Sequence, residues 1–284
     1  MKKIVLGKKK KQLISGTVSW LVIAVISLIF IYPLLFLLMN SFRQYLNKTP
    51  LLWFSEGHWE NFYFAVAMVP FFKYLLNTLK LVIIVLTCSM TFDFLYGYAL
   101  ARLNAPGKKI VFALVMIQLM IPSIAITIPQ FIYYNQLEIM NTYWIWVLAG
   151  VGGNAYLIFL TKQFLQSFPR ELEEAAKIDG CSLIGIIWRI FLPLSKPIMA
   201  IIIFNQFCGT WNDYMGPYMF FDSKKYPLAA ALFGNMYFIK DKAEVILEPV
   251  TMAACVLFSI PVIFMFFVMQ KYLVEGIVTT GIKG

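Results

Sequence analysis

The feature that most constrains this chain is an uninterrupted apolar run, residues 17–39, without a single charged side chain. A helix rises about 1.5 Å per residue, so roughly 20 such residues cross a hydrocarbon core about 30 Å thick. The run follows a cluster of lysines at 8–11. Because it is longer than the apolar region of a signal peptide and no small-residue cleavage site follows, we expect a retained membrane helix.

Five further apolar runs follow, at residues 75–100, 110–132, 143–164, 198–221 and 250–268. In total 61% of the residues are hydrophobic and 13% are charged. Soluble domains are nearer 45–50% apolar and about 25% charged, so a soluble fold of this length cannot bury so much apolar surface. The sequence therefore predicts an all-α, polytopic membrane protein with six transmembrane helices.

The net charge of +10 is explained by the distribution of basic residues among the predicted loops. Six spans place both termini on one side, and that side carries 16 of the 24 lysines and arginines. Cytoplasmic loops are enriched in Lys and Arg, so both termini are predicted to be cytoplasmic. The charge thus indicates membrane topology, and we expect no nucleic-acid partner.

The spans divide the chain into five parts. We predict a basic cytoplasmic tail (1–16), a first transmembrane helix (17–39), an extracytoplasmic loop (40–71), a core of five transmembrane helices (72–272) and a cytoplasmic C-terminal tail (273–284). Within the core, residues 168–197 form a long, charged cytoplasmic segment. The longest outer loop, 222–249, is expected to be exposed and charge-neutral.

The cytoplasmic segment 168–197 has the signals of two short helices. Pro169 suits a first helical position, acidic residues follow in the first turns where the helix dipole favours them, and Gly180 can supply a left-handed C-cap. Ser182 can cap a second helix, 183–191, which Pro193 would end. That helix carries Ile186, Ile187, Trp188 and Ile190, an apolar surface expected to need a partner. A solvated loop with good capping is the alternative.

This segment resembles the EAA signature of ABC importer permeases. The signature is carried by Glu174-Ala175-Ala176, Gly180, Ile190 and Leu192-Pro193, and each of its fixed positions matches here. In that family the loop forms a coupling helix that docks on an ATPase subunit. The resemblance implies a type I ABC importer permease architecture and the following coupling residues: Glu171, Glu174, Ala175, Ala176, Asp179, Gly180, Ile190, Leu192 and Pro193.

Further residues are similar to the carbohydrate-uptake permeases of this family, including the maltose permeases. They are Tyr98-Ala99-Leu100-Ala101-Arg102, Pro122, Pro129, Trp211-Asn212-Asp213 and the stretch from Gln270 to Gly284. Asp213 stands where the family more often has Glu. The resemblance implies a subunit of an ATP-driven importer in the bacterial plasma (inner) membrane. It also implies sugars, specifically oligosaccharides, as the substrate class.

The same resemblance implies the partners. They are a second permease subunit, two ATPase subunits that bind ATP and Mg, an extracytoplasmic sugar-binding protein and the lipid membrane. The chain has no GxxxxGK[ST] phosphate loop, so it is expected to bind no cofactor and to be no enzyme itself. In the maltose permeases most direct sugar contacts belong to the partner permease. In the family the loop equivalent to 222–249 reaches into the sugar-binding protein, so the resemblance implies Gly234-Asn235 as its tip.

Polar residues within the predicted spans are candidates for the substrate path. They are Asp93, Gln118, Asn154, Asn205, Gln206, Trp211, Asn212 and Asp213. Amide groups beside aromatic rings suit sugar hydroxyls, but hydrogen bonding between helices would explain them equally well. An unpaired carboxylate within a span costs about 2.5–3.5 kcal/mol, so Asp93 is expected to have a structural partner or to line the path.

The sequence leaves three other functions open. An ion-coupled secondary transporter would use Asp93 as its ion site, but such proteins show internal repeats, and none is evident here. An ABC permease could carry a solute other than sugar. A membrane enzyme would need clustered catalytic groups or metal ligands, whereas the single histidine, His58, is predicted on an outer loop and the four cysteines lie far apart. No metal site is expected.

Overall fold

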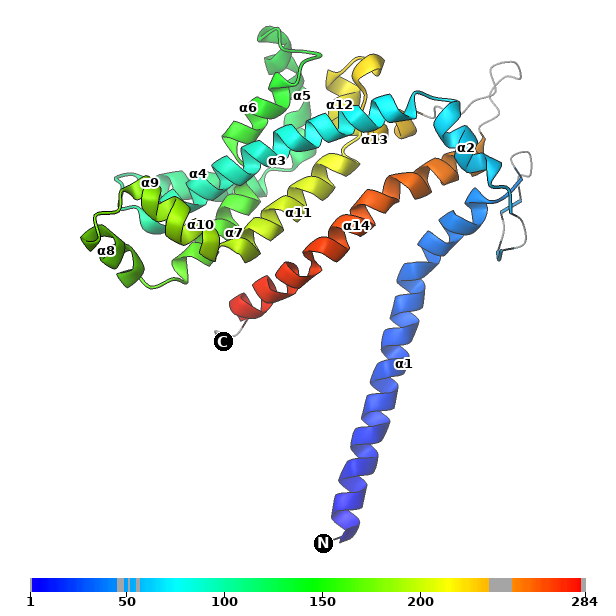
Figure 1. Cartoon of the computed structure of the whole chain (residues 1–284), viewed down its shortest axis with the longest axis horizontal. Coiled ribbons are helices and arrows are strands. Elements are labelled where there is room, and N and C mark those ends of the chain that lie inside the picture. The colour runs from blue at the N-terminus through cyan, green and yellow to red at the C-terminus, as the bar shows by residue number, and fades with distance from the viewer. Residues whose placement is uncertain (1, 45–48, 51, 55–56, 235–246, 282–284) are drawn as a thin grey trace. The chain divides into compact units, whose positions relative to one another are not determined.

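The computed structural model describes residues 2–44, 49–50, 52–54, 57–234 and 247–281, with side chains described between 18 and 272. Within these ranges every regular element is a helix, which confirms the all-α prediction (Figure 1). Four helical segments are long and apolar enough to cross a membrane: Val18–Ser41, Phe71–Arg102, Trp144–Gln166 and Glu248–Tyr272. Two sharply bent pairs would raise the number to six if each pair is one span.

The first bent pair is α4 (Lys108–Met120) and α5 (Ser123–Gln136), which meet at 105°. Ile121 is extended and Pro122 precedes the first residue of α5. A proline disfavours the helical conformation in the residue before it, so the helix breaks at Ile121 and restarts after Pro122. The other proline, Pro129, remains inside α5.

The second bent pair joins the segment Leu183–Leu194 to α11 (Lys196–Asn212) at 79°. The sequence predicted one span over 198–221, but α11 ends at Asn212 because Asp213 is extended. A separate short helix, α12 (Met215–Phe220), follows. The polar pair Asn212-Asp213 lies at this break, but the apolar residues on both sides of it led to the prediction of one continuous span.

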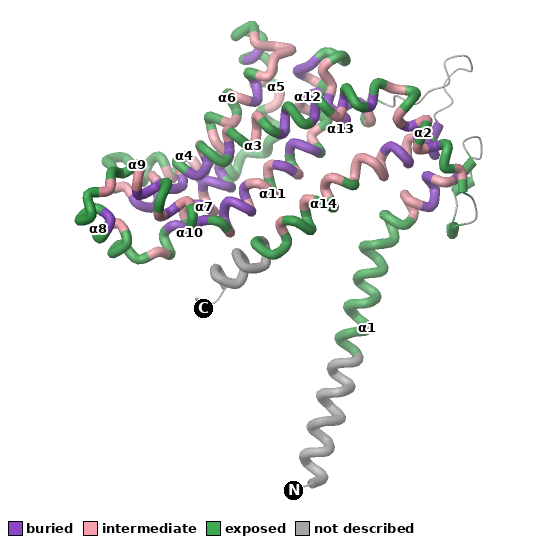
Figure 2. Tube along the Cα trace, viewed as in Figure 1, coloured by how far each residue is buried: buried purple, intermediate pink, exposed green. Residues whose placement is uncertain are grey.

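Contacts divide the chain into two compact units, the first formed by residues 1–69 and 235–257. It contains α1 (Lys2–Ser41), α2 (Glu60–Ala67) and the beginning of α14 (Glu248–Gly281). Asn61 donates to the carbonyls of Ser41 and Arg43, and the guanidinium of Arg43 lies 2.7 Å from Glu248 Oε2. From Val18 to Leu35 every residue of α1 is exposed (Figure 2), which suits a helix surrounded by lipid or by another subunit.

The second unit, residues 70–234 and 258–284, is built around α3 (Phe71–Arg102). This helix packs against α6 (Trp144–Gly152), α7 (Ala155–Gln166), α11 and α13 (Leu228–Phe233). Glycines allow close approach: a Cβ at Gly97 would lie 2.5 Å from Thr161, and one at Gly150 would lie 2.5 Å from Cys88. The buried core of the membrane bundle therefore follows α3 (Figure 2).

The segment predicted as the longest outer loop begins with regular structure. After the short 3-10 turn η2 (Ser223–Lys225), the described part contains α13, in which Leu228, Ala229, Ala230 and Ala231 are buried. The Leu228 amide donates to Thr78 Oγ1 of α3. The expectation of an exposed loop was thus wrong for α13, because its apolar residues pack on α3. Gly234 ends α13, and the rest of the proposed tip lies outside the described residues.

Candidate functional site

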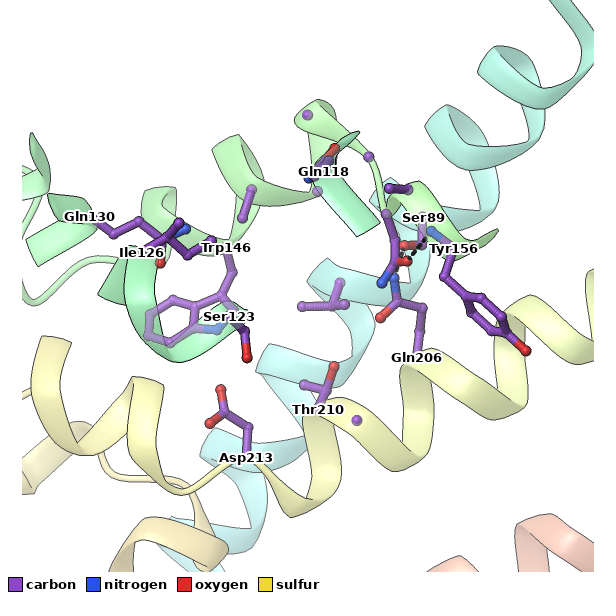
Figure 3. Close-up of a pocket in the computed structure, with 18 of the residues that line it drawn as sticks. Ser89, Gln118, Ser123, Ile126, Gln130, Trp146, Tyr156, Gln206, Thr210 and Asp213 are labelled. Carbon is purple, nitrogen blue, oxygen red and sulfur yellow. Dashed lines mark hydrogen bonds between the residues drawn. The ribbon is translucent and has the colours of Figure 1, made fainter. Parts of the chain in front are cut away.

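A cavity of about 970 Å³ opens within the second unit, at the places where the helices break. Its wall is formed by the end of α4, by residues spread along α5 from Ser123 to Tyr134, by α6 and its junction with α7, and by the second half of α11, with α3 behind (Figure 3). A smaller cavity of about 340 Å³ adjoins it and shares six of its lining residues: Ser123, Gln130, Tyr134, Trp146, Ala149 and Asp213. Broken helices thus create the hollow.

The cavity wall combines amide groups with aromatic rings. Gln118, Gln130, Asn154 and Gln206 contribute amides, and Tyr134, Trp146 and Tyr156 contribute aromatic side chains. Amides donate and accept hydrogen bonds, and aromatic faces pack against apolar C–H surfaces. Asp213 adds a carboxylate, which accepts hydrogen bonds, so this set of groups fits a polar ligand with many hydroxyl groups.

The α6–α7 break is fixed by a buried carboxylate. Gly152 ends α6, and Gly153 has a φ of +78°, a conformation that favours glycine. Asp93 of α3 is fully buried, and its Oδ1 accepts a 2.6 Å hydrogen bond from the backbone N–H of Asn154. The Asn154 side chain in turn caps α7 by accepting from the N–H groups of Tyr156 and Leu157. Asp93 therefore holds the start of α7 and does not line the cavity.

A second polar contact crosses the bundle one turn away on α3. The Gln206 amide of α11 donates to Ser89 Oγ (Figure 3), and both side chains lie along the cavity. Ser89 itself is 1% exposed. Together with Asp93 and Asn154, this contact connects α3, α7 and α11 at the level of the hollow.

The predicted path residues fall into two groups. Five of them line the cavity: Gln118, Asn154, Gln206, Asn212 and Asp213. The other three do not: Asp93 is buried behind the wall, Asn205 is exposed elsewhere on α11, and Trp211 is a core residue whose Nε1 donates to the Phe258 carbonyl. The sequence missed Ser89, Ser123, Gln130, Tyr134, Trp146, Tyr156 and Thr210.

A second notable feature is the helix pair between α7 and α11. The first helix, α8 (Glu171–Ile178), carries Glu171, Glu173 and Glu174 in its first turn. Gly180 has a φ of +78°, and the N–H groups of Gly180 and Cys181 bond back to the carbonyls of Lys177 and Ala176. These two bonds form a Schellman motif and confirm the predicted glycine C-cap.

The second helix of the pair begins as predicted and ends differently. The Ser182 hydroxyl caps α9 (Leu183–Ile186) by accepting from Gly185 N. A π segment, η1 (Ile187–Phe191), and α10 (Leu192–Leu194) continue the same helix through Pro193. The prediction that Pro193 stops it was wrong, and the wide π turn before the proline explains why the ring is tolerated.

The predicted coupling residues all lie on this pair, with different exposure. Glu171, Glu174, Ala175, Asp179, Gly180 and Pro193 are exposed, Ile190 and Leu192 are partly buried, and Ala176 is buried. The apolar surface expected on the second helix is divided: Ile186 and Ile187 belong to the core of this chain, whereas Trp188 is 63% exposed. Two further apolar side chains of the pair are exposed: Ile178, at 86%, and Ile184, at 67%.

A bundle of broken, apolar helices around a polar cavity, with an exposed helix pair at one end, defines a membrane transport component. Residues 93–279 match the family model of the binding-protein-dependent transport system inner membrane component, and the chain belongs to this family. This membership confirms the predictions of a multi-pass membrane protein, of an ABC transporter permease and of a transport protein rather than an enzyme.

Three relatives are similar over nearly the whole chain. The arabinooligosaccharides transport system permease protein AraQ of Halalkalibacterium halodurans is 28% identical and covers 96% of this chain and 100% of its own. The probable ABC transporter permease protein YurM of Bacillus subtilis is 30% identical, over 97% of this chain and 91% of the relative. The maltodextrin transport system permease protein MalD of Streptococcus pneumoniae is 27% identical, over 97% of this chain and 98% of the relative.

The fold is also that of a solved structure. A chain of a bacterial ABC transporter involved in the import of the acidic polysaccharide alginate superimposes with a TM-score of 0.81, over 92% of this chain and 96% of that one. The sequence identity is 22%, so the likeness concerns the fold.

Proposed function

We propose that this chain is the permease subunit of an ATP-driven importer of oligosaccharides and forms half of the translocation pore. The observation that carries the proposal is the cavity wall of Gln118, Gln130, Asn154, Gln206 and Trp146. Uncharged donors and acceptors beside an aromatic ring are the groups with which proteins bind sugars. The names of the relatives, which include arabinooligosaccharide and maltodextrin permeases, support the same substrate class.

The exposed helix pair is proposed to receive the energy of ATP hydrolysis. The pair would offer the ATPase subunit a surface that is both charged and apolar. The charge comes from the acidic first turn of α8, and the apolar part comes from the exposed Ile178, Ile184 and Trp188; the Gly180 C-cap ends α8 between them. In this proposal the coupling residues run from Glu171 to Pro193, as the EAA resemblance implies. ATP and Mg bind to the ATPase, and this chain needs no cofactor.

The proposed assembly contains a second permease subunit, two ATPase subunits and an extracytoplasmic sugar-binding protein. It lies in the bacterial inner membrane, where each bent pair crosses as one span, so that six spans leave both termini in the cytoplasm. The exposed face of α1 is available to lipid or to the second permease. The engagement of Asp93 with Asn154 supports this function over an ion-coupled carrier, whose ion site would need access to solvent.

The proposal is tested by reconstituting the complete complex in liposomes and measuring uptake of labelled maltooligosaccharides and arabinooligosaccharides. Uptake is expected to require ATP inside the liposomes and the binding protein outside. Uptake driven by an ion gradient without ATP, or transport of an unrelated solute alone, would contradict it.

The cavity itself is tested with a matched pair of variants in α5. Gln130 lines both cavities, whereas Gln136 is exposed at the end of the same helix. A hydrogen bond is worth about 0.5–1.5 kcal/mol, so Q130A is expected to raise the sugar concentration for half-maximal uptake roughly two- to tenfold. Q136A is expected to leave it unchanged, and equal effects of the two variants would remove the cavity from the substrate path.

A further inference from the structure

Arg102, the last residue of α3, is a buried cation with an unusually complete set of partners. Its side chain is 4% exposed. Nε donates to Glu173 Oε1 at 2.6 Å, Nη1 donates to the carbonyl of Phe168 at 2.8 Å and more weakly to that of Leu165, and Nη2 donates to the carbonyl of Pro169 at 3.0 Å. One guanidinium thus binds a carboxylate and three backbone carbonyls.

These partners belong to α7, to α8 and to the connection between them. Leu165 lies in the last turn of α7, where helix carbonyls lack partners within the helix. Phe168 and Pro169 form the connection to α8, and Glu173 lies in the first turn of α8. The guanidinium carbon also stands 5.2 Å from the centre of the Phe191 ring, in the π segment η1. Arg102 therefore joins the end of α3 to α7, α8 and η1.

The attachment matters because α8 has little else to hold it. Of its eight residues only Ala176 is buried. Hydrophobic packing therefore fixes one point of α8, and the Arg102–Glu173 contact fixes a second point near its beginning. A short helix held at one point can rotate about it, whereas two points define its direction.

We propose that Arg102 is a positioning residue for energy coupling. It holds α8 at a fixed orientation to α3 and α7, so that a displacement of α8 by the ATPase moves these long helices as rigid bodies instead of bending the loop. The inference rests on the proposed function, in which α8 meets the ATPase, and it assigns the transmission to a residue of α3 that lies outside the EAA signature.

The chemistry of the contact makes arginine difficult to replace. A lysine has a single ammonium group and cannot satisfy a carboxylate and three carbonyls that surround a planar fork. R102K keeps the charge and loses the geometry, whereas R102Q loses both. E173Q keeps the bonds to the carbonyls and weakens only the one to α8.

The test uses the complete complex with each variant and measures sugar uptake and ATP hydrolysis on the same liposomes, per assembled complex. Substitutions along a coupling route change coupling by amounts that correspond to roughly two- to thirtyfold. R102Q and R102K are expected to reduce the sugar imported per ATP within this range, and E173Q is expected to reduce it less. K109Q removes an exposed neighbouring cation and is expected to have no effect.

The ratio of sugar to ATP separates positioning from mere stabilisation, since lower stability reduces the number of complexes and leaves their ratio unchanged. An unchanged ratio in R102Q would overturn the proposal, as would failure of both R102K and R102Q to assemble, which would make Arg102 a folding determinant. If the wild-type complex shows no ATP-dependent uptake, the proposed function is wrong. If the wild-type complex imports sugar and R102Q imports as much sugar per ATP, only the role of Arg102 is wrong.

Discussion

Asp93 is a fully buried carboxylate on α3 with a backbone partner from another helix. A carboxylate in the middle of an apolar helix suggests an ion site, because such groups are costly in membranes and often functional. In the structure it accepts the Asn154 N–H and stands at the beginning of α7, where the helix dipole favours negative charge. Its position is explained by the broken α6–α7 span.

This role leads to a prediction for two variants of Asp93. D93N keeps an oxygen that can accept the Asn154 N–H, so ATP-driven uptake is expected to stay within about twofold of wild type. D93A removes the acceptor, and the buried N–H left without a partner is expected to cost about 1–3 kcal/mol of stability. The measurements are uptake in liposomes and thermal unfolding of the purified complex.

The two variants also separate the rival functions. An ion-coupled carrier that uses Asp93 would lose uptake in D93N, because the amide cannot take up and release a proton. Abolished uptake by a D93N complex that is as stable as wild type would therefore contradict the structural role.

The cavity residues were only partly predictable from the sequence. Gln118, Asn154 and Gln206 were identified because polar side chains stand out in apolar runs, and each lines the cavity. Asn205 was selected on the same ground and lies outside it, since the face of a helix that meets a hollow depends on packing. Tyr134 and Trp146 were missed because aromatic residues are common throughout membrane helices.

At the scale of elements, capping residues predicted where short helices begin and end, whereas bends and packing that depend on distant contacts were not predicted. The capped α8 and the start of α9 follow from Gly180 and Ser182, whose effects reach only a few residues. The 79° bend before α11 and the burial of α13 depend on contacts with distant parts of the chain. No local pattern records those contacts, so the sequence predicted a longer fifth span and an exposed loop.

The close packing of α3 on α7 gives a prediction with an internal control. A Cβ at Gly97 would lie 2.5 Å from Thr161, whereas one at Gly209 in α11 would meet nothing within 4 Å. G97A is expected to destabilise the complex by about 1–3 kcal/mol through overpacking. G209A is expected to be neutral or to stabilise it by up to about 1 kcal/mol, because alanine favours helices.

The comparison is made by thermal unfolding of the two variant complexes in the same detergent. The expected order of stability is G209A, then wild type, then G97A. If G97A unfolds at the temperature of G209A, α3 and α7 do not approach each other as closely as the structure has them.

At the scale of the whole molecule, the number of crossings depends on the two bent pairs. In the part of the chain that the structure describes, four helical segments can cross a membrane without a sharp bend. Six spans result only when α4–α5 and the segment from Leu183 to Asn212 each cross once. The distribution of basic residues favours six. If a bent helix pair instead entered and left the membrane on the same side, every later loop would lie on the opposite side from the one predicted. The membrane side of each loop therefore tests the number of spans.

We therefore predict the result of labelling single cysteines, placed in a chain from which the four native cysteines have been removed. The positions are exposed residues in successive loops and helix ends: Gly57, Lys109, Gln136 and Lys177. With six spans, a membrane-impermeant maleimide added to cells with an intact plasma membrane labels Gly57→Cys and Gln136→Cys. Lys109→Cys and Lys177→Cys react only after permeabilisation.

Labelling of Lys109→Cys and Gln136→Cys from the same side would mean that α4 and α5 form a re-entrant loop. Lys177 of α8 would then face outward, away from any ATPase, so the same experiment would also contradict the proposed coupling.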